Sequence, residues 1–171
     1  MLSLVLGTAF AVLCLQASLK DMTSFTIPNW INGGLVLLFF PAALVSGLGW
    51  SALGAHLLVA LIAFLVGFAL FSFRLFGGGD AKMVPAVLLW IGPLGVLDFI
   101  FGVALGGGLL AFVILSLRKA VPAELAPSFA QPALDKDAGV PYGIAITAGA
   151  FWAMPHSPIL SDFLSQLANF N

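Results

Sequence analysis

Three aspartates lie directly beside long apolar stretches of the chain. Asp21 follows the first stretch, Asp80 precedes the fourth, and Asp98 lies between the fourth and the fifth. An ionised carboxylate in hydrocarbon costs several kcal/mol unless water or a partner reaches it. Each of these acids is therefore expected to have a role that offsets this cost. Two carboxyl groups that meet in such a setting share one proton, so that one serves as general base and the other as general acid. The helices that carry the acids decide which two can meet.

The composition predicts that these helices lie in a membrane. Of the 171 residues, 61% are hydrophobic and only 8% are charged. A hydrocarbon core of ~30 Å requires roughly 20 apolar residues at a rise of ~1.5 Å per residue. This length predicts an all-α, polytopic integral membrane protein with about six transmembrane helices, at about residues 1–19, 31–48, 52–73, 80–97, 99–117 and 140–160.

The remaining segments are a polar linker and a tail. The linker, residues 118–139, contains three prolines and four charged residues between Glu124 and Asp137, so we expect it to lie in water. Residues 1–160 are therefore expected to form a single membrane-embedded domain, followed by a C-terminal tail at 161–171. Because no charged side chain precedes Lys20, the first stretch lacks the basic start of a signal peptide and is expected to be a retained helix.

The helix order predicts that Asp21 and Asp80 lie at the same membrane face. The end of the first helix and the start of the fourth fall on one side whichever way the protein inserts, whereas Asp98 falls on the other. The loops and helix ends at the shared face also contain every Lys and Arg of the chain, namely Lys20, Arg74, Lys82, Arg118, Lys119 and Lys136. The positive-inside rule therefore predicts that this face is cytoplasmic and that both termini lie outside.

The residues before Asp80 are three glycines, Gly77, Gly78 and Gly79. They permit unusual backbone angles and let another chain come close, which suits a site that binds a peptide in extended form. A plain loop that ends in an Asp helix cap is the alternative for this pattern, and Asp21 next to Lys20 is also typical of an interfacial ion pair. The presence of both acids at one face favours a shared site.

An ordered set of short motifs runs through the chain. It comprises Asp21, Ile27-Pro28-Asn29, the G-x-G-D element at residues 77–80 with Lys82 after it, and Pro141-Tyr142-Gly143. This set resembles the bacterial type IV prepilin peptidase family over nearly the whole chain. The resemblance implies a GxGD-type aspartic peptidase fold with Asp21 and Asp80 as the catalytic residues, supported by Gly77, Gly79, Lys82, Pro28 and Asn29.

The resemblance also implies a substrate and a location. Larger members of that family carry a cytoplasmic domain with paired C-x-x-C motifs and an N-methyltransferase activity, whereas this chain has one cysteine, Cys14. In size it is similar to the short peptidases that serve Flp-type (tight-adherence) pili. We therefore expect it to cleave the short basic leader of a prepilin or pseudopilin just before a hydrophobic helix of the substrate. Cleavage is expected without methylation, at the cytoplasmic face of the bacterial inner membrane.

The roles of the supporting residues stay open. Lys82 is either a charge that biases the acid pair or an anchor that reaches the membrane interface. Asn29 either hydrogen-bonds across the mouth of the site or caps the second helix. Pro28 fixes the backbone of the loop before that helix. His56 and His156 lie toward the far face, so neither is expected to act as a base.

Other partners and cofactors are not expected. A net charge of −1, with no basic cluster larger than Arg118-Lys119, argues against a nucleic-acid partner. A lone cysteine forms neither an intrachain disulfide nor a thiolate metal cluster, and acid–base chemistry by two aspartates requires no metal or cofactor. The glycines Gly102 and Gly106–Gly108 permit close helix contacts, either within the fold or between subunits of a homo-oligomer.

A small proton- or cation-coupled transporter or channel subunit is the main alternative function. In that case Asp21 and Asp80 would bind a proton or cation at discontinuous helix ends. Residues 1–85 do not visibly recur in 86–171, although transporters commonly have repeated halves, and the acids lie at one face rather than at the midplane. A non-catalytic membrane scaffold would leave the acid pair without a role, so a peptidase is the function that we expect.

Overall fold

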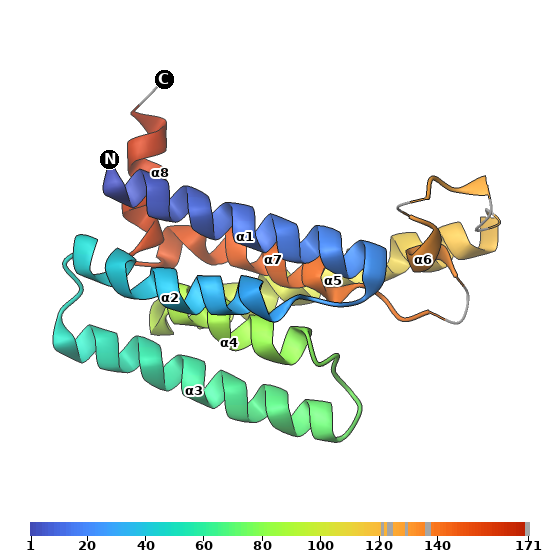
Figure 1. The fold of residues 1–171 in the computed structure, drawn as a ribbon, viewed down its shortest axis with the longest axis horizontal. Coiled ribbons are helices and arrows are strands. Elements are labelled where there is room, and N and C mark those ends of the chain that lie inside the picture. The colour runs from blue at the N-terminus through green and yellow to red at the C-terminus, as the bar shows by residue number, and fades with distance from the viewer. Residues whose placement is uncertain (121, 123–124, 129, 136–137, 170–171) are drawn as a thin grey trace.

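The computed structural model describes the chain except for residues 121, 123–124, 129, 136–137 and 170–171. The described residues form helices and no strands, which confirms the prediction of an all-α protein. In chain order the helices are α1 (Leu2–Ser24), α2 (Asn29–Val45), α3 (Trp50–Ser72), α4 (Asp80–Ile91), η1 (Pro93–Gly95), α5 (Val96–Ala120), α6 (Gln131–Leu134), α7 (Tyr142–Ala153), η3 (Met154–His156) and α8 (Leu160–Ala168) (Figure 1).

Three of the described helices are long and apolar enough to cross a membrane: Leu2–Ser24, Trp50–Ser72 and Pro93–Ala120. The apolar helix α2 is shorter, with 17 residues. Helices α4 and α7 have 12 residues each, which corresponds to about 18 Å against the ~30 Å of a hydrocarbon core. The chain is thus a membrane protein, while the count of six complete spans stays a prediction.

Two of the expected helices end six or seven residues earlier in the structure than their apolar stretches do. Helix α4 stops at Ile91 rather than at residue 97, because Gly92 adopts a left-handed φ of +72° and Pro93 lacks the N–H that would continue the ladder. The stretch 140–160 divides into α7, η3 and α8, with a proline in η3. Apolar composition therefore located these segments but not their ends.

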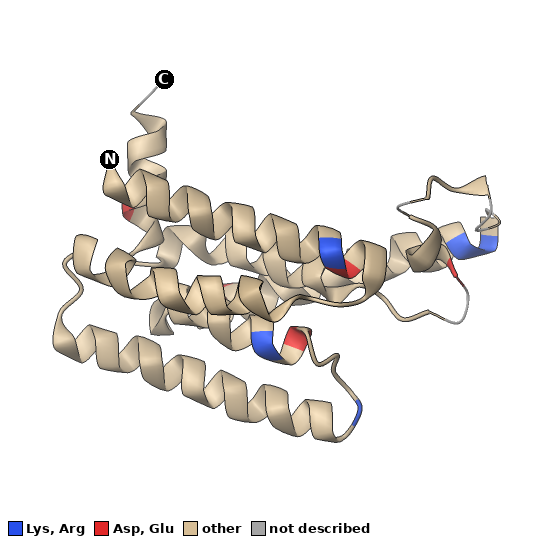
Figure 2. Ribbon diagram, viewed as in Figure 1, with Lys and Arg blue, Asp and Glu red and all other residues tan. Residues whose placement is uncertain are grey.

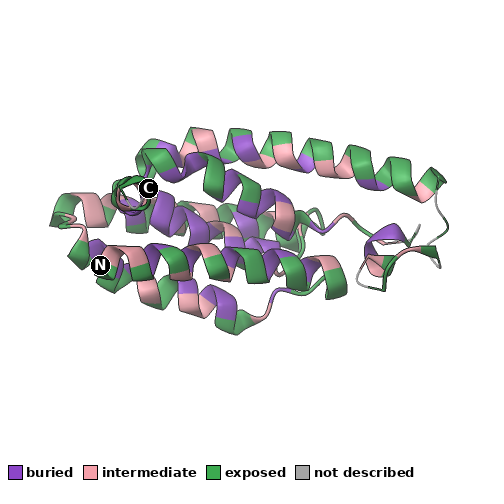
Figure 3. Cartoon of the chain, turned by 90° about the horizontal axis from the view of Figure 1, so that it is seen from above, coloured by how far each residue is buried: buried purple, intermediate pink, exposed green. Residues whose placement is uncertain are grey.

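Helices α4 and α7 form the centre of the bundle. Nearly all of α4 is buried, which is the pattern of a helix that is covered on every side. Helices α2 and α3 pack against α4, and α1 and α5 pack against α7 (Figure 1). Figure 3 shows the buried residues concentrated inside the bundle, while the outer helices keep long exposed faces. Those faces are rich in Leu, Val and Phe, as lipid contact requires.

The glycines of α5 serve contacts within the fold. A Cβ atom on Gly102 would lie 2.8 Å from the Cα atom of Gly149 in α7. Cβ atoms on Gly106 and Gly107 would lie 3.1 Å and 3.3 Å from the Cβ atoms of two alanines in α7. Gly108 has open space beside it. Small residues let two membrane helices approach closely, so three of the four glycines are explained by the packing of α5 on α7.

The charged residues are distributed unevenly along the bundle. Figure 2 shows the described Lys and Arg residues away from the N-terminus, from the start of α4 and the end of α1 to the far end of α5. The end of α1 and the start of α4 carry Asp21 and Asp80. Of the linker charges that the sequence analysis used, Glu124, Lys136 and Asp137 lie outside the described residues. The clustering at one end is the arrangement that the positive-inside argument assumed.

Candidate active site

Asp21 lies in the last turn of α1 and is buried, with 6% of its surface exposed. The helix continues to Ser24, further than the predicted residue 19, and ends where Phe25 takes a left-handed φ of 51° and donates its N–H to the Asp21 carbonyl. The carboxylate faces α7, where the Gly143 N–H donates a hydrogen bond of 2.7 Å to Oδ2. A charge-assisted bond from the first turn of a helix stabilises the ionised carboxylate.

Asp80 is the first residue of α4 and is equally buried, with 8% of its surface exposed. The backbone N–H of Gly77 hydrogen-bonds to its carboxyl group. A Cβ atom on Gly77 would lie only 2.9 Å from Oδ2, so a side chain here would push the carboxyl group of Asp80 aside. Within the described part of the chain, no hydrogen-bond partner reaches the buried Oδ1 atom of Asp80. One oxygen of this acid is therefore left for a proton, a water or a substrate.

The two carboxyl groups lie close enough for their charges to interact. Asp98 is remote from them in the first turn of α5, where its Oδ2 atom lies 3.3 Å from Nδ1 of His156. Since two adjacent carboxylates in a buried site cannot both ionise at low cost, Asp21 and Asp80 are suited to share one proton. Among the described residues, no group of three or more His, Cys, Asp or Glu side chains is placed to hold a metal ion.

A buried hydroxyl pair holds α7 against α1 one turn before Asp21. The Ser18 hydroxyl lies 2.7 Å from Oγ1 of Thr147 and 3.1 Å from the Gly143 carbonyl oxygen. The Thr147 hydroxyl donates to the Cys14 carbonyl at 2.9 Å. These contacts fix the turn of α7 whose N–H reaches Asp21. Sequence reasoning missed both hydroxyls, although the position of Ser18, three residues before Asp21, is a usable signal for a shared helix face.

A family model described as the type IV leader peptidase family matches residues 8–112, more than half of the chain. The chain belongs to this family. The matched region contains Asp21 and Asp80 but not α7, which supplies the Gly143 N–H. Membership identifies the chain as a membrane protease and does not favour the transporter alternative. No curated protein and no solved structure matches the chain.

The remaining predicted site residues lie in the loop before α2 and near the starts of α2 and α4. A Cβ atom on Gly79 would lie 3.1 Å from the Ile27 Cβ atom, so glycine lets the loop before α2 close onto the start of α4. Pro28 precedes α2 with an extended ψ of 141°.

Asn29 and Lys82 join α2 to α4. Asn29 makes no capping bond to its own helix; instead its Oδ1 atom accepts a hydrogen bond of 3.0 Å from Lys82 Nζ. Both side chains are exposed, and their bond crosses from the start of α2 to the first turn of α4. Two roles were considered for Asn29, a hydrogen bond to another part of the protein and a cap on its own helix. The structure shows the hydrogen bond, which joins α2 to α4.

His56 is buried far from the acids. Its Nδ1 atom lies 2.8 Å from the Leu89 carbonyl oxygen, and its ring stacks on Phe39 at a centroid distance of 5.9 Å. This histidine therefore fills the core between α3 and the end of α4, and it does not contact the carboxyl groups.

Proposed function

We propose that this type IV leader peptidase is an aspartic endopeptidase in which Asp21 and Asp80 activate water to cut a prepilin leader. The observation that carries the proposal is the meeting of two buried carboxyl groups from different helices, in a chain with few other acids. General acid–base catalysis by such a pair requires no metal. The pair is supported by Gly77 and Gly79, whose backbones approach the acid and the neighbouring loop closely.

The hydrogen bonds support different roles for the two acids. Both acids accept a backbone N–H, but the one bound by Asp21 comes from the first turn of α7, whose partial positive charge favours the ionised form, so Asp21 serves as the base. Asp80 carries the shared proton on its free Oδ1 atom. Water attacks the scissile carbonyl carbon and gives a proton to Asp21, while Asp80 gives its proton to the carbonyl oxygen. The resulting diol collapses as Asp21 returns a proton to the leaving nitrogen and Asp80 takes one from a hydroxyl group.

The distribution of charge supports an orientation for this site. The described Lys and Arg residues lie away from the N-terminus, toward the end of α1 and the start of α4, which carry the acids. The positive-inside rule assigns such an end to the cytoplasm. The active site then faces the cytoplasm from the bacterial inner membrane, with both termini outside and residues 1–160 acting as one domain. A short basic leader on a prepilin or pseudopilin is reached from that side.

The cysteine content supports cleavage without methylation by this chain. Cys14 is its single cysteine and is buried in α1, so the paired C-x-x-C motifs of the methylating relatives have no counterpart. The substrate class that we propose is the Flp-like prepilin, in keeping with the layout of the motifs along the chain.

The test of this function is leader removal in cells. The chain is co-expressed with a prepilin, and wild type is compared with Asp21→Asn and Asp80→Asn on a gel that resolves loss of the leader. Asparagine keeps size and polarity but not proton transfer, so both variants should leave the prepilin uncut. Asp98→Asn is the matched control, because this acid lies away from the pair, and it should cut normally.

Membrane levels of the variants must match for this comparison. Cleavage by either Asp21→Asn or Asp80→Asn at normal membrane levels would contradict the acid-pair mechanism.

A further inference from the structure

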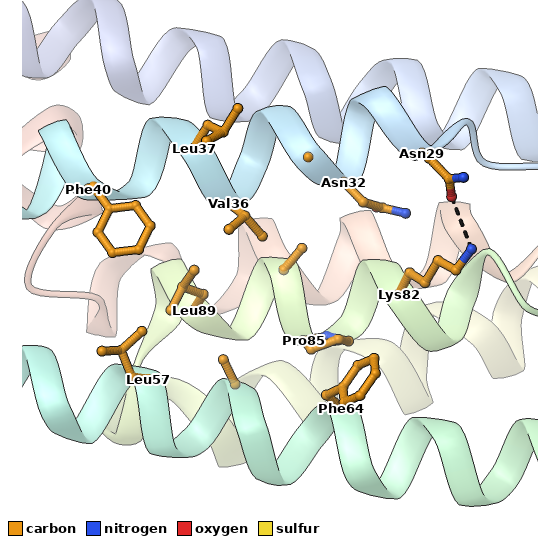
Figure 4. Close-up of a pocket in the computed structure, with 13 residues that line it drawn as sticks. Asn29, Asn32, Val36, Leu37, Phe40, Leu57, Phe64, Lys82, Pro85 and Leu89 are labelled. Atoms are coloured by element: carbon orange, nitrogen blue, oxygen red, sulfur yellow. Dashed lines mark hydrogen bonds between the residues drawn. The ribbon is translucent and has the colours of Figure 1, made fainter.

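A groove of about 560 Å³ runs along the bundle between α2 and α3, with α4 as its floor (Figure 4). Its walls are apolar over most of their length and include Val36 and Phe40 from α2, Leu57 and Phe64 from α3, and Pro85 and Leu89 from α4. Small residues line it as well, among them Gly33, Ala60 and Ala86, and small residues allow the close approach of another helix.

One end of the groove lies beside the acid pair. Its polar lining consists of Asn29, Asn32 and Lys82, and Lys82 follows Asp80 by two residues on α4. From Asn29 to Phe40 the wall formed by α2 extends for about 16 Å at the rise of an α-helix. The groove therefore leads from the catalytic end of the bundle into its apolar part.

Asn32 is the one lining residue whose polar atoms are both buried and unpaired. Its side chain keeps 7% of its surface exposed, and no described residue hydrogen-bonds to its Oδ1 or Nδ2 atom. Figure 4 shows this side chain pointing from α2 into the space above α4. Buried polar groups are almost always paired, so an amide in this state indicates that a partner binds in the groove. Its donors and acceptor complement the C=O and N–H of a peptide group.

We propose that the groove binds the apolar segment of the substrate that follows the cut, and that Asn32 hydrogen-bonds to the peptide backbone at the start of that segment. This inference rests on the proposed function. A membrane helix must be unwound where it is cut, and its freed N–H and C=O groups then lie where water is scarce. Asn32 supplies one acceptor and two donors for these groups. An acyl chain of a lipid has no group that would pair with the amide.

The first test separates binding from chemistry and from folding. Asn32→Leu removes the amide and keeps a side chain of similar size, so we expect the KM for a prepilin in reconstituted vesicles to rise about tenfold with little change in kcat. An amide that only supported the fold would give a lower melting temperature on substitution. Here the amide is unpaired in the free enzyme, so the melting temperature should stay the same or rise. Asn169→Leu, the same change at the exposed end of α8, should alter neither quantity.

The second test locates the substrate directly. A photo-crosslinking amino acid replaces Leu57, which lines the groove, or its neighbour Leu58, which is exposed but lies outside the groove lining. Both are placed in the inactive Asp80→Asn enzyme so that uncut prepilin accumulates. We expect a crosslink to the apolar segment of the prepilin from position 57 and not from position 58.

The outcomes of these tests separate the groove inference from the proposed peptidase function on which it rests. The inference would be overturned by an unchanged KM in Asn32→Leu, or by crosslinks from position 57 to lipid alone. The peptidase function would still hold in either case if the wild-type enzyme cleaved the prepilin. Cleavage of the prepilin by the Asp80→Asn enzyme would instead overturn the acid-pair mechanism itself.

Discussion

The hydrogen bond between Gly143 and Asp21 is the contact on which the assignment of the base depends, and a single methyl group perturbs it. In Gly143→Ala the new Cβ atom would lie 2.9 Å from the Asp21 Cβ atom and 3.1 Å from Oδ2. Both distances are shorter than ordinary van der Waals contact, so the carboxylate must move away from α7. The N–H···Oδ2 bond of 2.7 Å would then lengthen or break.

The size of the effect follows from the kind of bond. A hydrogen bond to a charged group contributes about 1.5–3 kcal/mol, and each ~1.4 kcal/mol in the barrier corresponds to a factor of ten in rate. We therefore expect kcat to fall by about 10- to 100-fold. Alanine is favoured over glycine by about 1 kcal/mol inside a helix, which offsets part of the steric cost, so α7 should remain folded.

The assay is the rate of leader removal by purified enzyme in vesicles at saturating prepilin. Gly139→Ala is the matched control, because a Cβ atom there meets nothing within 4 Å, and its rate should equal that of wild type. The reasoning would be refuted if Gly143→Ala cut at the wild-type rate with its melting temperature unchanged, since the ionised form of Asp21 would then not depend on this amide.

Two further predictions concern the fold and the product. Gly92→Ala should destabilise the protein by about 1–3 kcal/mol, because Gly92 has a φ of +72° and its Cβ position is occupied by the His56 ring. Thermal unfolding measures this, with Gly54→Ala as the control at a site with open space; equal melting temperatures would contradict it. The mature pilin released by this chain alone, with S-adenosylmethionine present, should have an unmodified N-terminus by mass spectrometry; a gain of one methyl group would contradict cleavage without methylation.

Local features of the sequence were enough to locate the two acids and the start of α4. Helix order alone predicts that Asp21 and Asp80 share a face, and the structure brings their carboxyl groups near one another. The ends of the helices were harder to predict from the sequence. Residues 92–97 are mostly apolar, yet the backbone turns at Gly92 because the His56 ring of α3 packs against it, and that contact joins residues far apart in the sequence.

The contacts that complete the site are also between distant residues. Gly143 follows Asp21 by 122 positions and Thr147 follows Ser18 by 129, so no local pattern pairs them. The resemblance drew attention to Pro141-Tyr142-Gly143, but it did not indicate that an N–H of this motif binds an aspartate. Asn32 was missed although it is a polar residue in an apolar helix, a pattern that by itself calls for a partner.

Backbone N–H groups at the starts of the two short central helices help an apolar chain to hold a negative charge at the acid pair. Helices α4 and α7, with 12 residues each, both begin at the acid pair, since Asp80 is the first residue of α4 and Gly143 lies in the first turn of α7. The N-terminus of a helix has unpaired N–H groups and a partial positive charge, and each such end stabilises a nearby anion by about 0.3–1 kcal/mol, or up to ~2 kcal/mol when partly buried. The Gly143 N–H at the start of α7 and the Gly77 N–H in the loop before α4 each bind one of the carboxyl groups, so they favour the singly ionised pair. A second ionisation would place two negative charges next to each other. The point at which α7 begins is therefore a functional property, because an α7 that began one turn earlier would pair the Gly143 N–H inside the helix and leave Asp21 without it.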